Sequence, residues 1–388
     1  MTTGSKGPSL VVILSDGIRG HLFQSRGVAS HLAELCGAFS VEMNVPSYKG
    51  CRRFWVLKVL GRALLRAGSV KARRWLRFAG SDAQTLLSRY RMALDERGVS
   101  GKESLVISAG SSAAPLTLAL ARAMGGKSCT LMTPSILGTS PFDYAVVPSH
   151  DGTKNGRILE TLGAPNSVNR SNLADQAQEM LNDYPGDDVR WGVLVGGDDQ
   201  NYRLSPLWTD RIVGELLRIA EDREVSLYIT TSRRTSPATE ARLKALCQGN
   251  DRVAMLLLAS QSDDNPVPGI LGACQKIFCT EDSVSMISEA ATAGTNVYLL
   301  RVGRKKGWRR ILQGLTERLV GWRLLSERSL WGAPRFDRMI DQFIERGLIA
   351  EMPSDVAAWR SFLQSFVAEP PQFNEARRAA RWILENWR

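Results

Sequence analysis

The sequence predicts an α/β protein made of two doubly wound, Rossmann-like domains that face each other across a cleft. Short runs of β-branched residues alternate with longer helical patterns, as in parallel sheets covered by helices on both faces. The chain has 388 residues, which suits two domains better than one. Each half opens with an apolar run that enters a glycine-bearing loop, VVILSDGIRGH in the first half and GVLVGGDDQNYR in the second.

Six apolar runs predict strands that are buried on both faces: SLVVILS, SLVISAG, YAVVPS, WGVLVGG, SLYITTS and KIFCTED. Helical spacing predicts helices over residues 24–35, 113–124, 210–222 and 286–293. The polar, turn-rich stretch NDYPGDDVR, residues 182–190, separates the halves. We therefore expect one domain over residues 1–182, a second over 183–370, and a final helix over 371–388 that packs back on the first domain.

Composition indicates an ordinary globular protein, with 44% hydrophobic and 23% charged residues. The six cysteines include no CxxC pair, which argues against a disulfide framework or a zinc site and favours reduced thiols in the cytoplasm. No apolar run approaches the ~18–20 residues of a spanning helix, so we expect a protein that does not cross a membrane.

The net charge of +11 belongs to two segments. Residues 43–81 contain ten basic and no acidic residues, and residues 301–316 contain six basic and no acidic ones. Within segment 48–80, Lys58, Arg62 and Arg66 are spaced four apart among aromatic and aliphatic residues, which is typical of an amphipathic helix lying in an anionic membrane surface. The expected membrane contacts are Arg52, Arg53, Trp55, Lys58, Arg62, Arg66, Arg73, Arg74 and Trp75.

Two other interpretations of this segment are weaker. The helix could pack on the core and present a solvated basic face. Nucleic-acid binding would also explain the charge, but aliphatic side chains are poor stacking platforms and no nucleic-acid module is visible. We expect no nucleic-acid partner.

The clearest motif is FCTEDSVSMISEAATAG, residues 278–294. A predicted strand ends near Thr280 and a helix begins near Ser285, so backbone N–H groups at the helix start favour a diphosphate. Glu289 lies one turn further along the same face, where a carboxylate accepts both hydroxyls of a ribose. The alternative is a serine cap followed by a glutamate on the helix surface.

Two further loops follow strands in the second half. Ser232, Arg233 and Arg234 follow SLYITT, and paired arginines bind phosphate or carboxylate in a bidentate manner; two solvated surface arginines are the alternative. Gly196 and Gly197 let backbone approach a ligand closely, although a tight turn alone also demands glycine.

The first half offers three candidate loops. His21 follows the first strand and loop, where it either acts in chemistry or merely caps a helix; His150 follows a predicted strand end, and His31 within a helical pattern is expected to be structural. Ser111 and Ser112 lie in a small-residue loop that admits a substrate or simply allows close packing. The GxGxxG, Walker, HExxH and GxSxG signatures are absent.

Taken together, the motifs resemble a known family. SDGIRGHLFQSRGVA, SAGSSAAPLTLALAR, FDYAVVPSHDG, TLGAP, VLVGGDDQNYR, TTSRRTS and CTEDSVSMISEAATAG occur in order from residue 15 to residue 294. They are similar to the mitochondrial-fission ELM-type family and its bacterial relatives, which look like GT-B glycosyltransferases. The pattern is more distantly similar to the N-acetylglucosaminyltransferase that forms lipid II. In that enzyme, a GGH loop corresponds to IRGH with His21, a GG-x-Q segment to Gly196, Gly197 and Gln200, and a ribose-binding glutamate to Glu289.

The resemblance implies a metal-independent glycosyltransferase with a GT-B-like fold and no cofactor beyond its nucleotide-sugar substrate. It implies transfer to a lipid-linked or glycolipid acceptor, of the envelope or lipopolysaccharide type, by a cytoplasmic protein that is peripheral on the inner face of the cytoplasmic membrane. His21 or Asp16 would be the catalytic base, a choice the sequence leaves open. The expected donor contacts are Gly196, Gly197, Gln200, Ser232, Arg233, Arg234, Glu281, Asp282, Ser283, Ser285, Met286 and Glu289. The expected acceptor contacts are Gly17, Arg19, Gly20, Gln24, Ser111, Ser112 and His150. A non-catalytic adaptor of the same fold and a nucleotide-sugar epimerase or hydrolase are the alternatives.

Overall fold

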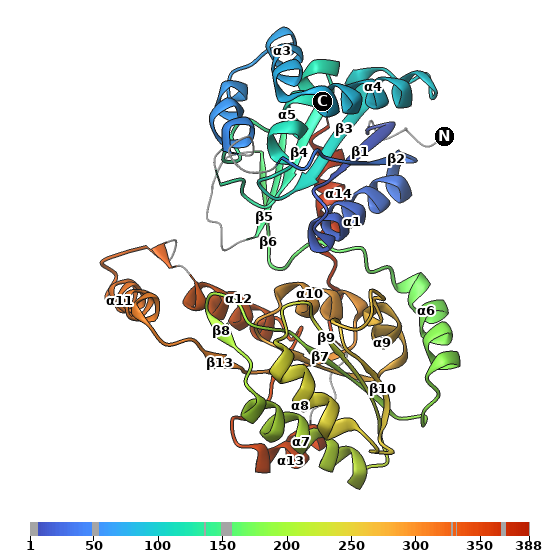
Figure 1. Cartoon of the computed structure of the whole chain (residues 1–388), viewed down its shortest axis with the longest axis vertical. Coiled ribbons are helices and arrows are strands. Elements are labelled where there is room, and N and C mark those ends of the chain that lie inside the picture. Colours follow the sequence, from blue (N-terminus) through green and yellow to red (C-terminus); the bar gives the residue numbers. More distant parts are fainter. Residues whose placement is uncertain are drawn as a thin grey trace. The chain divides into compact units, whose positions relative to one another are not determined.

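The computed structural model describes residues 7–48, 54–135, 137–148, 157–326, 329–330, 332–365 and 370–387, with backbone only for Phe54, Trp55, Lys58 and Ser365. The chain divides into two compact units. Unit 1 comprises Met1–Ser167 and Asn374–Arg388, and unit 2 comprises Val168–Phe373. Figure 1 shows a sheet with its covering helices in each unit.

The sheet of unit 1 has six parallel strands in the order β2-β1-β3-β4-β5-β6. Its strands are β1 (Leu10–Ser15), β2 (Phe39–Asn44), β3 (Ser104–Ala109), β4 (Lys127–Leu131), β5 (Tyr144–Pro148) and β6 (Ile158–Thr161). The chain moves from β1 to one side for β2 and to the other side for β3. The strand order therefore reverses between β1 and β3, which is the switch point where open α/β sheets bind ligands.

Successive side chains of β1 point to opposite faces of the sheet and pack into two separate hydrophobic cores. Leu10, Val12 and Leu14 pack with the helices α3, α4 and α5, whereas Val11 and Ile13 pack with α1 and α14. The elements around the sheet are α1 (Arg19–Cys36), η1 (Phe54–Val59), η2 (Leu60–Leu64), α3 (Ser69–Ala79), α4 (Ser81–Asp95), η3 (Gly101–Glu103), α5 (Ala114–Met124) and α14 (Glu375–Glu385). The C-terminal helix α14, red in Figure 1, thus belongs to unit 1.

The sheet of unit 2 also has six parallel strands, in the order β10-β9-β7-β11-β12-β14. Its strands are β7 (Arg190–Val195), β9 (Ser226–Thr231), β10 (Val253–Leu257), β11 (Lys276–Thr280), β12 (Asn296–Leu300) and β14 (Ala350–Glu351). Counted within the unit, this is the 3-2-1-4-5-6 order of the Rossmann fold, with its switch point between β7 and β11.

A separate antiparallel pair joins β8 (Tyr202–Arg203) to β13 (Gly303–Arg304). The other elements of unit 2 are α6 (Arg170–Asp183), α7 (Pro206–Asp222), α8 (Pro237–Cys247), α9 (Val267–Ala273), α10 (Val284–Ala293), α11 (Trp308–Gly321), α12 (Ala333–Glu345), η6 (Val356–Ala358) and α13 (Trp359–Ser365). Buried aromatic side chains of β7, β11 and β12, namely Trp191, Phe278 and Tyr298, stack across one face of the sheet.

The division between the units falls at Ser167–Val168, whereas the sequence pattern placed it at 182/183. The reason is that α6 packs on α9 within unit 2. A side-chain carbon at Gly272 would lie 2.2 Å from the carbonyl oxygen of Leu173, so the two helices approach at backbone distance. Arg170 Nε also donates to the carbonyl oxygen of Thr292, at 3.0 Å. The polar stretch at 182–190 is therefore a connection inside unit 2.

The predicted fold class is confirmed, since both units are doubly wound α/β structures with parallel sheets. The six predicted strands are β1, β3, β5, β7, β9 and β11, and the four predicted helices lie within or overlap α1, α5, α7 and α10. The strands of the two large sheets that pattern alone did not predict are β2, β4, β6, β10, β12 and β14, and the short pair β8 and β13 was not predicted either.

Candidate functional site

Three loops of unit 2 meet at one edge of its sheet. Gly196–Gly197 follows β7, Ser232–Thr235 follows β9, and Glu281–Ser283 follows β11. Because β9, β7 and β11 are neighbouring parallel strands, their carboxyl ends lie side by side around the switch point. The sequence motifs of the second half are thus brought together.

The two glycines are required by the packing of these loops on one another. A side-chain carbon at Gly196 would lie 2.2 Å from Asp282 Oδ2, and one at Gly197 would lie 2.1 Å from the backbone of Arg234. The Asp282 carboxylate accepts hydrogen bonds from the Gly197 N–H, at 2.8 Å, and from Arg234 Nη2, at 2.9 Å. Close approach between protein loops therefore explains this Gly-Gly pair without a ligand.

Glu281 and Asp282 are structural members of the edge. The Glu281 carboxylate accepts from the Val302 N–H, at 2.8 Å, and from Arg301 Nη1, at 2.9 Å. The Glu281 and Asp282 side chains are 1% and 0% exposed, and burial raises the pKa of each carboxyl group. Both were predicted as donor contacts. Three of their four carboxylate oxygens accept from protein groups and so hold the loop in shape, whereas Asp282 Oδ1 is buried without a hydrogen-bond partner among the described residues.

Other groups at this edge remain available to a ligand. Arg233 is exposed and makes no hydrogen bond or ion pair with the described residues. Helix α10 begins after Ser283, whose side chain does not cap it, so its first-turn N–H groups lie at an uncapped, electropositive end. Ser285 on that turn is exposed and Met286 is half-buried.

Glu289 is the most unusual carboxyl group of unit 2. It is half-buried on α10, one turn beyond Ser285, and has no hydrogen-bond or ion-pair partner among the described residues. Burial without a partner raises its pKa to about 7. A desolvated carboxylate of this kind gains most from two hydroxyl donors, as a ribose would supply.

Two predicted donor contacts are engaged in local structure. Ser232 Oγ accepts from the Arg234 N–H, at 3.2 Å, and so shapes the turn after β9. Gln200 is exposed, and its amide oxygen accepts from Arg309 on α11.

At the switch point of unit 1, His21 pairs with Asp16. His21 Nδ1 lies 3.0 Å from Asp16 Oδ2 and 3.2 Å from Oδ1. A carboxylate only accepts, so in the neutral imidazole Nδ1 carries the proton and Nε2 has the lone pair. Asp16 also accepts from the Ile18 N–H, at 3.2 Å, and its side chain is 3% exposed against 22% for His21. The buried carboxylate therefore orients the imidazole, which is the more accessible of the two groups.

The end of β3 completes this arrangement. Gly110 has φ +83°, and a side-chain carbon there would lie 2.4 Å from His21 Cε1. The backbone after β3 therefore lies against the imidazole. The sequence motifs point to the neighbouring serines and not to Gly110, although a glycine in the loop SAGSS is a signal for close approach.

The other predicted acceptor contacts that the structure describes lie in the loops after β1 and β3 or in α1. Gly17, Arg19 and Gly20 are exposed on the loop after β1 and the start of α1. Gln24 is buried, with its amide nitrogen 4.0 Å from the Met132 sulfur. Ser111 is exposed and accepts from the Ser135 N–H, at 2.9 Å, and Ser112 is half-buried. His150 lies outside the described residues.

His31 has the structural role expected of it. It is buried on α1, its Nδ1 lies 2.9 Å from Glu34 Oε2, and its Nε2 lies 3.1 Å from the side-chain nitrogen of Asn374, the residue before α14. It thus joins the two ends of unit 1.

Segment 48–80 is not one continuous helix, because η1 and η2 precede α3. The prediction that Trp75 contacts the membrane is wrong, because Trp75 is buried in the core. Its Nε1 donates to the Leu60 carbonyl, at 2.8 Å. Arg73 is exposed but donates to the Ala123 carbonyl, at 3.0 Å. Arg52, Arg53 and the side chains of Trp55 and Lys58 lie outside the described residues.

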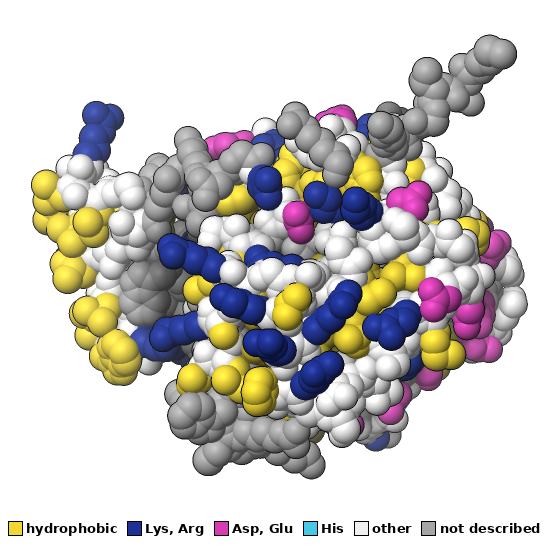
Figure 2. Space-filling model, turned by 90° about the horizontal axis from the view of Figure 1, so that it is seen from above, with side chains coloured by type: hydrophobic (Ala, Val, Ile, Leu, Met, Phe, Trp, Pro, Cys, Tyr) yellow, Lys and Arg dark blue, Asp and Glu magenta, His cyan; other side chains and the backbone are white. Residues whose placement is uncertain are grey.

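An exposed basic surface nevertheless remains on unit 1. Arg62, Arg66 and Arg74 are exposed and form no ion pair within the described part of the chain. Figure 2 shows Lys and Arg side chains gathered on this side of the molecule, with apolar side chains between them. Val70 and Phe78 on α3 are 62% and 77% exposed. We name Arg62, Arg66, Lys71, Arg74, Arg77, Val70 and Phe78 the α3 surface.

No described helix combines the length and hydrophobicity needed to pass through a bilayer. Among the same residues, no group of three or more His, Cys, Asp or Glu side chains is placed to hold a metal ion.

Two doubly wound parallel units, with polar groups gathered at each switch point, define a GT-B-like α/β protein. The chain belongs to the mitochondrial fission ELM1 family, whose sequence profile matches residues 19–387. The resemblance drawn from the motifs is therefore confirmed.

Individual proteins are more distantly similar. An uncharacterized protein, RP120, of Rickettsia prowazekii (strain Madrid E) is 25% identical over 153 residues, a match that covers 39% of this chain and 42% of that protein. The UDP-GlcNAc 2-epimerase of Methanocaldococcus jannaschii superposes with a TM-score of 0.53 at 13% identity, over 96% of this chain and 98% of the other. A family 9 glycosyltransferase from Veillonella parvula DSM 2008 has a TM-score of 0.41 at 10% identity, over 99% of both chains. At these identities the likeness concerns the fold.

Proposed function

We propose that this protein is a metal-independent GT-B-type glycosyltransferase. It would transfer a sugar from a nucleotide-sugar donor to a lipid-linked or glycolipid acceptor at the inner face of the cytoplasmic membrane. The observation that carries the proposal is the Asp16–His21 pair at the switch point of unit 1, because it leaves an oriented imidazole with a free Nε2.

The donor would bind at the edge of unit 2. The diphosphate would accept hydrogen bonds from the first-turn N–H groups of α10 and from the unpartnered guanidinium of Arg233. The Glu289 carboxylate would accept the two ribose hydroxyls, which offsets its present desolvation. The ion pair between the exposed Arg234 and the buried Asp282 carboxylate would keep the loops that carry these groups in register.

In the chemical step, the acceptor hydroxyl oxygen forms a bond to the anomeric carbon of the donor. The bond from that carbon to the diphosphate oxygen breaks, and the nucleoside diphosphate leaves with the electron pair. His21 Nε2 takes the hydroxyl proton, and Asp16 stabilises the resulting imidazolium. Arg233 and the α10 N-terminus stabilise the departing negative charge.

The α3 surface supports the membrane location. Each basic residue near an anionic bilayer contributes about 1 kcal/mol, and Phe78 and Val70 add apolar contact.

The test is a calorimetric screen of nucleotides and nucleotide-sugars with the wild-type protein, followed by incubation of the best ligand with membrane lipid extract. We expect binding of one donor class and appearance of a glycosylated lipid. Conversion of the donor without any acceptor would instead indicate an epimerase or hydrolase, and absence of binding across the whole panel would indicate a non-catalytic adaptor.

A further inference from the structure

Helix α11 and the turn after it expose an unusual amount of apolar surface. Of the seventeen large hydrophobic side chains that are exposed in the described chain, seven lie in this stretch of unit 2. They are Trp308, Ile311, Leu312, Leu315, Trp322, Leu324 and Leu325, with exposures from 41% to 73%. The yellow side chains at the left edge of Figure 2 lie where Figure 1 places α11.

The spacing gathers these side chains into one stripe. With 3.6 residues per turn, Trp308, Ile311, Leu312 and Leu315 fall on a single face, about 100° wide, and Trp322 continues that face beyond the end of the helix. Arg309 and Arg318 fall on the two flanks of the stripe, while the acidic Glu317 falls on the opposite face.

The opposite side of α11 is the one that holds it to unit 2. Gln313 is buried and donates to the side-chain oxygen of Asn201, at 3.0 Å. Arg309 donates to Gln200, and Val320 is buried on the side that faces α12. The helix is therefore fixed with its polar side inward, which leaves the apolar stripe without a covering element among the described residues.

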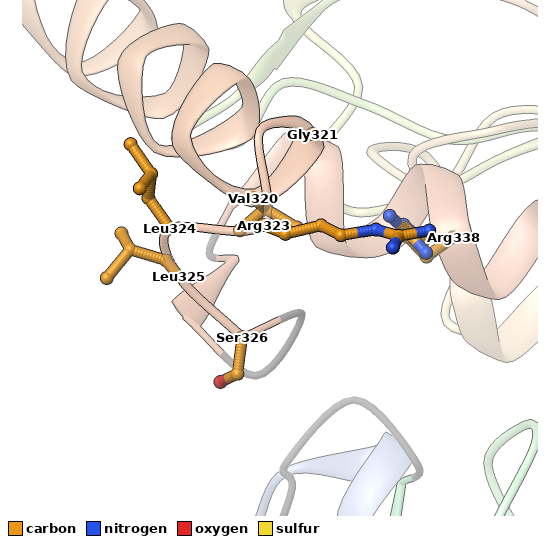
Figure 3. A pocket seen from close by; sticks show the side chains of 7 residues that line it. All are labelled: Val320, Gly321, Arg323, Leu324, Leu325, Ser326 and Arg338. Carbon is orange, nitrogen blue, oxygen red and sulfur yellow. The ribbon is translucent and has the colours of Figure 1, made fainter.

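The turn after α11 lines a pocket of about 550 Å³, with Val320, Gly321, Arg323, Leu324, Leu325, Ser326 and Arg338 around it. Figure 3 shows the Arg323 and Arg338 side chains pointing toward one another, while Leu324 and Leu325 point away from them. Among the described residues, none that lines the pocket is acidic. The Arg323 guanidinium beside the apolar side chains of Leu324 and Leu325 suits a phosphate group attached to an apolar chain.

The charge of the whole stretch points to the same chemistry. Residues 305–326 contain six basic residues and one acidic residue. Tryptophan and leucine on one face with arginine on its borders are typical of helices that lie in the interfacial plane of a bilayer, where arginine side chains reach the headgroups. Contact with a second copy of this stretch would place like charges side by side.

We propose that α11 and residues 322–326 are a lipid-binding element of unit 2. The Trp308–Trp322 stripe would enter the boundary between headgroups and acyl chains of an anionic membrane. Arg318 and Arg323, which are both exposed, would bind the lipid phosphates. The proposal deepens the membrane location given under the proposed function, but it does not require sugar transfer.

Vesicle flotation tests the proposal with the full chain. The vesicles contain phosphatidylcholine alone or phosphatidylcholine with phosphatidylglycerol. We expect binding to the anionic vesicles, and a decrease of at least about tenfold in the partition coefficient for the variant W308S/L315S/W322S. The variant R318Q/R323Q should lose the preference for anionic lipid and much of the salt dependence. Because all these side chains are exposed, both variants should unfold at the wild-type temperature.

Matched controls lie in the same unit. Leu207 on α7 is 79% exposed and Lys244 on α8 is exposed, so L207S and K244Q remove comparable groups elsewhere and should leave flotation unchanged. Undiminished flotation of the stripe variant overturns the proposal. A wild-type dimer that the stripe variant converts to monomer, with flotation unaltered, also overturns it, because the stripe would then be a protein interface. Nucleotide-sugar calorimetry on the same variants distinguishes failure of the lipid-binding proposal from failure of the proposed glycosyltransferase function. Donor affinity should be unchanged in each variant, because the substitutions lie outside the proposed donor site.

Discussion

Gly110 and His21 belong to different strand-end loops, yet no side chain at residue 110 can coexist with the observed position of the imidazole. A β-carbon there would lie 2.4 Å from His21 Cε1, and the residue has φ +83°. The consequence is that the orientation of His21 depends on β3 as well as on Asp16.

The substitution G110A should therefore impair transfer through geometry. The new methyl group forces the imidazole away from Asp16, and the positive φ adds a strain of about 1–3 kcal/mol. We expect kcat to fall at least about tenfold with an altered pH profile, whereas the donor KM should hardly change. A G125A variant is the control, because Gly125 also has positive φ but has no atom within 4 Å of an added β-carbon. Equal losses of kcat in both variants would contradict a positioning role for Gly110.

Replacing either member of the pair should remove most of the chemistry. H21A removes the base, and D16N offers Nδ1 an amide that no longer fixes the tautomer. Each should lower kcat by about 10²–10⁴, and the double variant should cost little more than H21A alone. Calorimetry should show unchanged donor affinity in all three. The control H31Q, on the same helix, should lower thermal stability while kcat in the folded protein stays near normal.

The pKa of Glu289 predicts a pH dependence of donor binding. Burial raises this pKa to about 7, so the carboxylate that would accept the ribose hydroxyls is populated only as pH rises through that value. We expect nucleotide-sugar affinity to increase between pH 6 and 8, the window set by that pKa. In E289Q the affinity should be about 1–3 kcal/mol weaker at pH 8 and independent of pH across this range. Calorimetry at matched ionic strength measures both.

The raised pKa of Glu289 also predicts that the stability of the protein decreases as pH rises, whereas donor affinity should increase. The pKa of Glu289 in the folded protein lies above the ordinary value of 4.5. Between pH 4.5 and 7 the native protein therefore still holds a proton on Glu289 that the unfolded chain has lost. The free energy of unfolding consequently falls as pH rises from 4.5 to 7. E289Q should therefore be more stable than wild type at pH 8, by about 1 kcal/mol because Glu289 is only half-buried, and similar at pH 4.5. Urea unfolding at the two pH values checks this. A variant less stable at pH 8 would indicate a hidden partner for the carboxylate.

Arg301 should stabilise the edge of the unit 2 sheet where the candidate donor loops meet. It bonds Glu281 at 2.9 Å and Glu351 at 2.9 and 2.6 Å. R301Q leaves the 1%-exposed Glu281 carboxylate with the Val302 N–H alone, and we expect a loss of about 2–4 kcal/mol of unfolding free energy at pH 7. Since burial already raises the pKa of Glu281, the loss should shrink as pH falls and the carboxyl group takes a proton. A loss that does not depend on pH would assign the effect to lost packing of the Arg301 side chain and not to its carboxylate partners.

The α3 surface should bind anionic vesicles through charge. The variant R62Q/R66Q/R74Q should lose about 3 kcal/mol of vesicle affinity, and high salt should weaken the wild type similarly, because the attraction is screened over ~8–10 Å. Donor affinity should not change, since the donor groups lie in unit 2. Arg218 on α7 provides the control substitution R218Q. Wild-type flotation of the triple variant would mean that this surface is simply solvated.

Much of the fold follows from local pattern. Buried parallel strands produce continuous β-branched runs, and six of the twelve strands in the two large sheets have them. Strands such as β2 (FSVEMN) and β14 (Ala350–Glu351) lie at sheet edges, are partly exposed or very short, and carry no comparable signal. Pattern also places the candidate loops correctly, because the residue that follows a parallel strand lies at the carboxyl edge whatever the rest of the chain does.

The sequence by itself determined the two doubly wound units and the edges at which His21, Arg233 and Glu289 lie. Only the tertiary structure decided which of the surrounding residues are buried and which groups they bond. Glu281 and Asp282 bond protein groups, Trp75 is buried, Asp16 orients His21, and α6 belongs to unit 2. The physical reason is the distance along the chain over which each property is set. Strand and helix patterns depend on residues two to four positions apart, so local periodicity encodes them. Burial and hydrogen-bond partners depend on segments tens to hundreds of residues away, and local periodicity does not encode those.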